Sequence, residues 1–149
     1  MKLHPNSSQR HFIDETIRIH CYVYNALITG VKPYFGSNGH LPSENELNKV
    51  CTRIWNNMLS FQGIYQNTMN CISKRVLNAY RKCNPSIRTR KYRDDEGSEG
   101  IVFELTIPRF RKPCRYSSFS YLSNKSFSIV PDAKGKGRRC LRLGRWTVY

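Results

Sequence analysis

The stretch NTMNCISKRVLNAYRKC, residues 67–83, carries the clearest structural pattern of the sequence. Its apolar side chains step by three, four, three and four residues, at Met69, Ile72, Val76, Ala79 and Cys83. That spacing places them on one face of an α-helix. Pro85 predicts that the helix ends just before it, because proline cannot continue the backbone hydrogen bonding.

The opposite face of this expected helix is polar. Amide and cationic side chains recur along it at similar spacing: Asn67, Asn70, Lys74, Asn78 and Arg81. Two interpretations of this stripe stay open. It is either a solvated helix surface or a DNA-facing surface, on which asparagines pair with adenine edges and cations neutralise phosphates.

Two more helices are expected before this one, over about residues 7–29 and from residue 43 to near Gly63. Each starts with a pair typical of a capping box, in which a short polar side chain is followed three residues later by Gln or Glu. These pairs are Asn6 with Gln9 and Ser43 with Glu46. A loop is expected to join the two helices at the helix-breaking residues Gly30, Pro33, Gly36 and Gly39.

The second half of the sequence has β character. Residues 88–100, RTRKYRDDEGSEG, are expected to form an exposed linker or loop, because charged residues and glycines dominate them. Short runs rich in β-branched and aromatic residues follow, separated by Pro, Gly and Lys turns: IVFELTI, YSSFSY, KSFSIV, RRCLRL and RWTVY. The sequence therefore predicts an α+β fold that combines a helical bundle with a small oligonucleotide-binding-like β-barrel.

Charge is the most informative part of the composition. The 149 residues include 25 Lys or Arg and 10 Asp or Glu, a net charge of +15. Residues 74–149 hold nineteen of the basic and six of the acidic residues, so this half alone carries +13. Such an excess attracts polyphosphates. Since the basic residues are spread through aromatic and β-like sequence rather than along one amphipathic helix, nucleic acid is favoured over a membrane surface as the partner.

A cytoplasmic location is expected from three features. The sequence contains no run of 18 apolar residues and no signal-peptide pattern. Its six cysteines include no C-x-x-C pair and several fall on apolar helical positions, so they are expected to be free thiols. Free thiols fit a reducing compartment.

The stretch IPRFRKPCRYSSFSY, residues 107–121, interleaves four cations with four aromatic side chains. Such a mixture is typical of nucleic-acid surfaces, where cations contact phosphates and aromatic rings stack on bases. Ile107 and Phe110 are expected to belong to the core rather than to a stacking surface.

No catalytic constellation is found in the sequence. It contains no P-loop, no G-x-S-x-G, no H-E-x-x-H and no Gly-rich dinucleotide turn. The carboxylates of Asp94, Asp95 and Glu96 lie in a Gly/Ser-rich segment and are expected to be solvated rather than to bind a metal ion. We therefore expect no catalytic residue, no metal ion and no cofactor in this chain, whose expected role is binding rather than cutting.

Five blocks of sequence follow one another along the chain in this order: KLHPNSSQ, CYVYNALI, VLNAYRKC, IPRFRKPCRYSSFSY and RRCLRLGRW. Together they resemble the N-terminal part of TnpB, also called OrfB, the RNA-guided nuclease of certain insertion sequences and a relative of the type V CRISPR effectors. The resemblance implies three parts: residues 1–6 as the first strand of a wedge domain, 7–95 as a helical recognition domain with a basic linker, and 96–149 as the remainder of the wedge β-barrel, into which the helices are inserted.

The resemblance also implies partners and a location at the nucleoid. The barrel and the basic linker would hold a guide RNA scaffold, while the helices and a barrel loop would flank a short motif in target double-stranded DNA. The DNA-motif contacts would fall at Ser43, Gln66, Asn67, Asn70, Ser120 and Tyr121. Contacts to the nucleic-acid backbone would fall at Lys74, Arg81, Arg88, Arg90, Lys91, Arg109, Arg111, Lys112, Arg115, Arg138 and Arg139.

The chain stops at Tyr149, before the position where the family's RuvC nuclease domain and its carboxylates begin. The resemblance therefore leaves open whether the chain is a fragment, a degenerate copy or a natural subunit of an enzyme whose nuclease half is a separate RuvC-like chain. Two other functions also stay open. One is an RNA-independent factor or repressor that binds double-stranded DNA, and the other is the non-catalytic subunit of a split nuclease.

Overall fold

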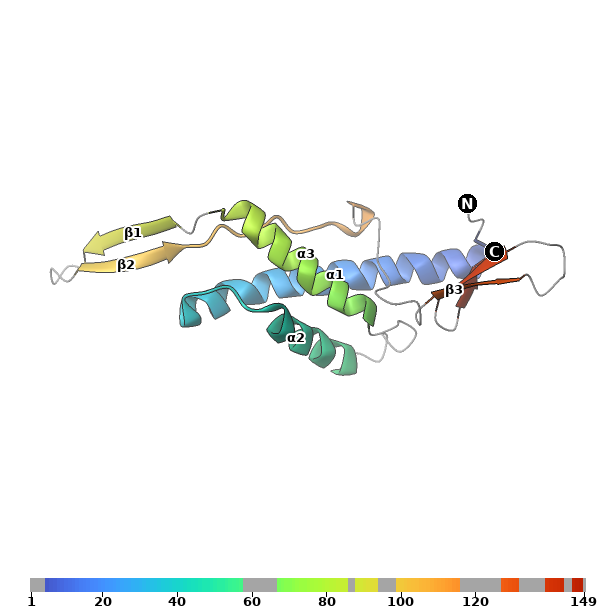
Figure 1. The fold of residues 1–149 in the computed structure, drawn as a ribbon. Coiled ribbons are helices and arrows are strands. Elements are labelled where there is room, and N and C mark those ends of the chain that lie inside the picture. The colour runs from blue at the N-terminus through green and yellow to red at the C-terminus, as the bar shows by residue number, and fades with distance from the viewer. Residues whose placement is uncertain are drawn as a thin grey trace.

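The fold is built around three helices that pack on one another. The computed structural model describes residues 5–57, 67–85, 88–93, 99–115, 127–131, 139–143 and 146–148. The helices are α1 (Ser7–Asn38), α2 (Glu44–Asn57) and α3 (Asn67–Cys83). Figure 1 shows α1 as a long rod, with α2 and α3 lying against its C-terminal half. α3 contacts both of the other helices, so it closes the bundle.

Both expected helix starts are confirmed. Asn6 accepts a hydrogen bond from the backbone N–H of Gln9 (2.9 Å), and the Gln9 side chain accepts one from the backbone N–H of Asn6 (2.8 Å), which completes a capping box. Ser43 and Glu46 make the same reciprocal pair ahead of α2. These local bonds satisfy N–H groups that a helix start leaves without partners.

The loop expected at residues 30–39 is wrong. α1 continues through Gly30, Pro33 and Gly36 and ends only at Gly39, which adopts the left-handed conformation (φ 71°) that glycine tolerates best. The reason is tertiary burial: Val31 and Phe35 are only 1% and 4% exposed and continue the apolar face of α1. Pro33 lies on the solvent side, where water can bond the carbonyl that its missing N–H leaves unpaired.

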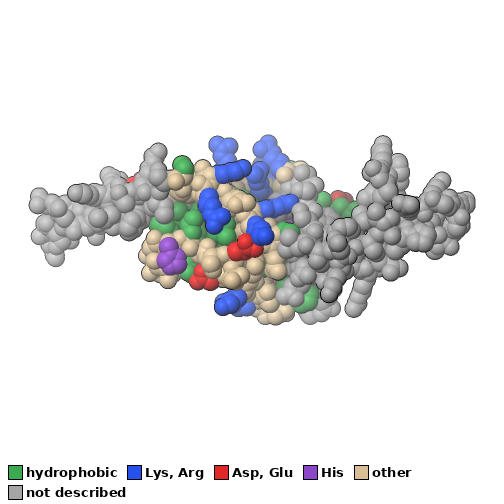
Figure 2. Space-filling view, viewed as in Figure 1, with side chains coloured by type: hydrophobic (Ala, Val, Ile, Leu, Met, Phe, Trp, Pro, Cys, Tyr) green, Lys and Arg blue, Asp and Glu red, His purple; other side chains and the backbone are tan. Residues whose placement is uncertain are grey.

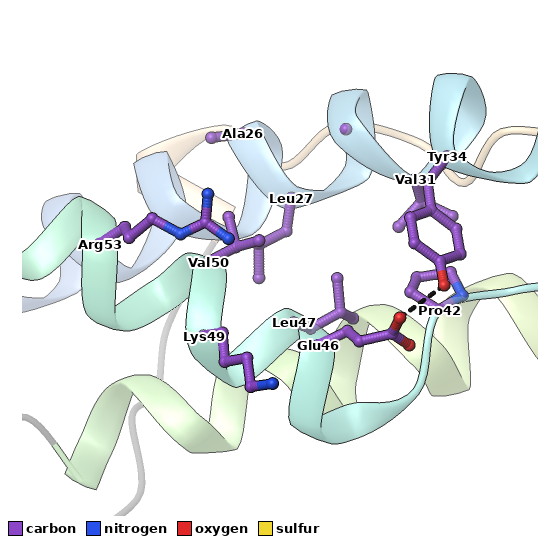
Figure 3. Close-up of a pocket in the computed structure, with 11 residues that line it drawn as sticks. Ala26, Leu27, Val31, Tyr34, Pro42, Glu46, Leu47, Lys49, Val50 and Arg53 are labelled. Atoms are coloured by element: carbon purple, nitrogen blue, oxygen red, sulfur yellow. Dashed lines mark hydrogen bonds between the residues drawn. The ribbon is translucent and has the colours of Figure 1, made fainter. Parts of the chain in front are cut away.

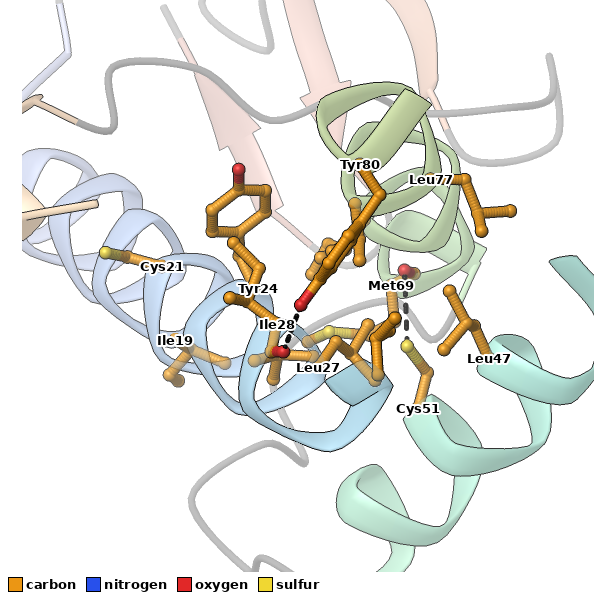
Figure 4. Close-up of a cluster of buried hydrophobic side chains, with 14 residues drawn as sticks. Ile19, Cys21, Tyr24, Leu27, Ile28, Leu47, Cys51, Met69, Leu77 and Tyr80 are labelled. Atoms are coloured by element: carbon orange, nitrogen blue, oxygen red, sulfur yellow. Dashed lines mark hydrogen bonds between the residues drawn. The ribbon is translucent and has the colours of Figure 1, made fainter. Parts of the chain in front are cut away.

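The core lies where α3 meets α1 and α2 (Figure 4). The expected apolar face of α3 is confirmed at Met69, Ile72 and Val76, all at most 1% exposed, whereas Cys83 is exposed. Leu77 and Tyr80 are also buried, because α3 packs on two helices and therefore needs a wider apolar face than one stripe.

Tyr80 ties α3 to α1 through a polar contact inside this core. Its hydroxyl donates a hydrogen bond to the backbone carbonyl of Ile28 (2.7 Å), as Figure 4 shows. Burial raises the pKa of Tyr80 to about 12, so the hydroxyl keeps its proton and remains a donor. This contact fixes the end of α3 against the middle of α1.

The β-barrel expected in the second half is wrong. The described strands form two separate antiparallel sheets: β1 (Arg88–Arg93) with β2 (Glu99–Glu104), and β3 (Phe127–Pro131), β4 (Arg139–Leu143) and β5 (Trp146–Val148) in that order. A barrel needs its first and last strands to pair, and neither sheet closes in this way. Where side chains are described the chain is mostly helical, so the α+β barrel architecture is not observed.

The linker expected over residues 88–100 is also wrong for most of its length. Arg88 pairs with Glu104 and Arg93 with Glu99, so the two runs form an antiparallel hairpin. Thr89 and Tyr92 favour a strand, whereas the four cations of β1 suit a loop as well, and the backbone pairing with β2 shows that this run is a strand. A short 3-10 turn, η2 (Pro113–Arg115), follows β2 and contacts α1.

None of the helices within the described ranges is long and apolar enough to cross a membrane.

His20 is a buried polar group at the contact of α1 with α3. Its Nδ1 lies 2.7 Å from the Thr16 carbonyl, which can only accept, so Nδ1 carries the proton and Nε2 accepts from the Thr68 hydroxyl (3.0 Å). Burial, with a smaller contribution from the charge of Arg75, lowers the pKa of His20 below its usual value of 6.5. The ring is therefore held neutral.

We expect this histidine to make the stability of the protein depend on pH. The unfolded chain takes up a proton on His20 at a higher pH than the folded chain, so the free energy of unfolding should fall as pH drops below 6.5, by at most about 1.4 kcal/mol per pH unit. Urea unfolding between pH 7.5 and 5 measures this decline, and His20→Gln should make it shallower.

The matched control is His11→Gln, which removes an exposed histidine of the same helix and should keep the full decline. An unchanged decline in His20→Gln would assign the pH dependence to other groups. Glu46 contributes little in this range, since its pKa of about 2 in the folded protein and its usual value of 4.5 in the unfolded chain both lie below pH 5.

Candidate nucleic-acid interface

An extended segment, residues 105–115, runs from β2 along the helical bundle to η2 (Figure 1). We call this segment the strap. Its backbone is held at two residues, each by one asparagine side chain. The Asn84 amide donates to the carbonyl of Thr106 (2.9 Å) and accepts from its N–H (2.7 Å). The Asn25 amide does the same to Arg111, with both bonds at 2.9 Å.

These two asparagine clamps act as a neighbouring β-strand would, because each offers one donor and one acceptor to a single residue. Asn25 lies on α1, and Asn84 follows the last residue of α3. The same Asn84 side chain also donates to the carbonyl of Tyr80 (2.9 Å) at the end of α3. The strap is therefore tied to α1 and to the end of α3.

Further contacts hold the strap to the bundle. The Cys21 thiol donates to the carbonyl of Arg111 (3.2 Å), and burial raises the pKa of Cys21, which keeps the thiol protonated as a donor requires. Pro108 is buried, and Leu105 packs against the core. The backbone of the strap is thus anchored by polar and apolar contacts while its long side chains are left on the outside.

Four cations lie on this strap, and all of them are exposed: Arg109, Arg111, Lys112 and Arg115. The sequence from 105 to 115 contains no acidic residue, and none of the four joins an ion pair within the described part of the chain. Figure 2 shows lysine and arginine side chains gathered over the helical middle of the molecule, with few acidic side chains among them. The strap thus presents a row of four cations on a held backbone, none of them in an ion pair with a described residue.

The strap also exposes apolar side chains. Phe110 is 59% exposed and Ile107 is 41% exposed, so the expectation that both belong to the core is wrong. The cause is that the strap lies outside the bundle and is held mainly through its backbone. Tyr22, 55% exposed, lies one turn before Asn25 on α1. Proteins that bind single-stranded nucleic acid use exposed aromatic rings to stack on bases and nearby cations to contact the phosphates.

Of the expected DNA-motif residues, Ser43, Asn67 and Asn70 lie in the described part of the chain. Ser43 is exposed, but its hydroxyl is bonded to the Glu46 carboxylate (2.7 Å) as part of the α2 cap. Asn67 is the first residue of α3, and Asn70 on the same helix is half-buried. Gln66, Ser120 and Tyr121 lie outside the described residues.

The expected backbone-binding residues fall into three groups. The four strap cations are brought together, as described above. On α3, Lys74 pairs with Glu44 of α2 (3.7 Å), and Arg81 is exposed in the last turn, where a cation also complements the helix dipole. Arg88, Arg90 and Lys91 lie on β1 and Arg139 on β4, while Arg138 lies outside the described residues.

The residues that hold the strap were missed by the sequence analysis. Asn25 and Asn84 carry no distinguishing local pattern, since asparagine on a helix or at its end is ordinarily a surface or capping residue. Their partners lie 86 and 22 residues away along the chain. Only the packing of the helices shows that both amides face the same segment.

Among the described residues, no group of three or more His, Cys, Asp or Glu side chains could hold a metal ion. A comparison with family models, with curated proteins and with solved structures finds no match to this chain. The function is therefore inferred from the chain's own residues.

Removing either clamp should loosen the strap at one residue only. Asn25→Ala should speed amide hydrogen exchange at Arg111, and Asn84→Ala should speed it at Thr106, each by roughly five- to thirtyfold for the one or two hydrogen bonds lost. Hydrogen exchange followed by NMR measures both amides in one experiment. Asn38→Ala, at the exposed far end of α1, is the control and should change neither.

Slow exchange at Arg111 that persists in Asn25→Ala would contradict the clamp, since no other described side chain bonds that N–H.

Proposed function

We propose that this chain binds nucleic acid and that the strap is its main contact with the phosphate backbone. The observation that carries the proposal is the row of four exposed cations on a backbone held by two asparagine clamps. Exposed cations attract polyphosphates, and a preorganised backbone lowers the conformational entropy lost on binding.

The described aromatic side chains favour contact with unpaired bases. Phe110 lies directly between Arg109 and Arg111 in the sequence, and the residue is 59% exposed. Stacking of a base on such a ring contributes about 1–3 kcal/mol by alanine substitution, whatever the base. Duplex bases are already stacked on one another, so the strap suits single-stranded parts of a structured RNA better than continuous duplex.

At a finer level, we propose that the chain is the recognition part of a TnpB-like RNA-guided system and that the RNA bound by the strap is a guide scaffold. The ordered sequence blocks support this. The blocks CYVYNALI and IPRFRKPCRYSSFSY supply Asn25 and Arg111, and VLNAYRKC supplies Tyr80, so three of the blocks meet in space. The proposal places the chain in the cytoplasm, at the nucleoid, with target DNA as a further partner.

RNA-independent binding of double-stranded DNA through α3 is the second candidate. Its polar stripe is less available than the strap, because Lys74 is paired with Glu44 and Asn70 is half-buried. Asn78, Arg81 and Lys82 remain exposed near the end of α3, and they are the residues such a function would use. No feature within the described ranges favours the role of a subunit in a split nuclease.

The strap is tested by removing three of its charges. The triple variant Arg109→Gln, Arg111→Gln and Lys112→Gln should bind a structured RNA more weakly. It should also lower the slope of log affinity against log salt by about 2, because each lost phosphate contact on a single strand removes about 0.7. Fluorescence anisotropy over a salt series measures both quantities.

The control for this experiment removes three positive charges elsewhere. Arg10→Gln, Lys32→Gln and Lys49→Gln together change the net charge equally, at positions that are exposed and away from the strap. This variant should keep most of the salt slope. Equal slopes for the two triple variants would mean that net charge, and not the strap, drives binding.

The RNA-guided proposal is tested by specificity. RNA transcribed from the flank of the gene should bind more tightly than unrelated RNA of equal length at one stated moderate salt concentration, because a scaffold is recognised by shape as well as charge. A duplex DNA shift assay with and without RNase completes the experiment. Equal affinity for both RNAs, with DNA binding that survives RNase, would replace this proposal by the second candidate.

A further inference from the structure

A groove of about 260 Å³ lies between α1 and α2, on a different part of the bundle from the strap. Figure 3 shows its walls, with Leu27 and Val31 of α1 facing Leu47 and Val50 of α2. Most of its lining is apolar.

The groove exists because α1 places small residues where α2 lies beside it. Ala26 and Gly30 are one turn apart on the α1 wall, and a Cβ added to Gly30 would meet no atom within 4 Å. Val50 is 36% exposed, whereas Leu27, Val31 and Leu47 are at most 5% exposed, so the uncovered apolar surface of these walls is mainly that of Val50. Uncovered apolar surface favours a ligand that removes it from water.

One end of the groove is closed by a hydrogen-bonded carboxylate. Glu46 accepts from the Tyr34 hydroxyl (2.6 Å), from the Ser43 N–H (2.8 Å) and from the Ser43 hydroxyl (2.7 Å). The Tyr34 bond, followed by the two Ser43 bonds, lowers the pKa of Glu46 to about 2. This negative charge is fully engaged by its three donors.

The other end carries positive charge. Arg53 lies there, and Lys49 lies one turn before it on α2, between Arg53 and Glu46; no described acidic side chain pairs with either. Like charges at this spacing cost a few tenths of a kcal/mol in a helix. Arg53 lies two turns from Glu46, about 10 Å along α2, and Figure 3 shows the two at opposite ends of the groove.

We propose that the α1–α2 groove binds a small amphipathic anion, whose apolar chain or ring fills the groove and whose carboxylate meets Arg53. The apolar walls take the body of the ligand, and Arg53 takes its charge at the end remote from Glu46. This site is independent of the strap and of nucleic-acid binding, because it shares no residue with either.

The probe for the test is sodium octanoate, titrated into the full chain and followed by calorimetry and NMR. Saturable binding is expected. Gly30→Phe fills the groove and should weaken the binding at least tenfold, whereas Gly30→Ala improves helix propensity without filling the groove and should keep it. Circular dichroism checks that both variants retain their helices.

Charge recognition is tested separately from the cavity. Arg53→Gln should weaken octanoate binding about tenfold, as expected when a charge-assisted hydrogen bond is lost. Lys32→Gln removes an exposed cation of α1 outside the groove and should have no effect. The neutral analogue 1-octanol should bind more weakly than octanoate.

Three outcomes of the octanoate and octanol titrations overturn the proposal. They are the absence of saturable octanoate binding, an equal loss in Gly30→Ala and Gly30→Phe, and equal affinity for octanoate and octanol. Vesicles of phosphatidylglycerol should not compete, because the groove is too small for two acyl chains. Competition by such vesicles would indicate a membrane-facing surface and would overturn the assignment to a free ligand.

Discussion

The packing of α3 against both α1 and α2 is the constraint on which the described structure depends. Tyr80 is buried in this contact, and its hydroxyl bonds the carbonyl of Ile28. A buried hydroxyl without a partner costs free energy, so this bond favours the one arrangement in which the end of α3 lies against the middle of α1. Asn84 follows α3 directly, and Asn25 lies one turn before Ile28. The contact between Tyr80 and Ile28 therefore also determines where the two asparagines that hold the strap are located.

The strap shows how a bundle can present charge without burying it. Thr106 and Arg111 have their backbone groups bonded by amide side chains, so the segment between them is held without a β-partner. Its cations stay in water, where their mutual repulsion is screened and modest. A polyanion would relieve that repulsion while meeting a surface already ordered. The packing of the helical core, against which the strap lies, offsets the unfavourable free energy of this repulsion.

Surfaces that look alike in the sequence differ once the helices pack. The polar stripe of α3 contains amides and cations, yet α2 supplies Glu44 to Lys74 and part of Asn70 is covered. On α2, Lys49 and Arg53 have no described acidic partner and border an apolar groove. Whether a charged side chain is free to bind a ligand depends on its neighbours in space. The strap and the groove differ in this respect from the polar face of α3.

The sequence by itself determined the local features of this protein. Capping boxes at Asn6 and Ser43 and the apolar face of α3 follow from bonds and contacts within a few residues, so spacing alone reveals them. The tertiary structure decided the rest. Because Phe35 is buried, α1 continues past Pro33. The backbone pairing of the strands forms two open sheets instead of a barrel. The strap is held outside the bundle by side chains that are far away in the sequence, and Phe110 is therefore exposed. Each of these outcomes depends on contacts distant in sequence, which residue spacing does not encode.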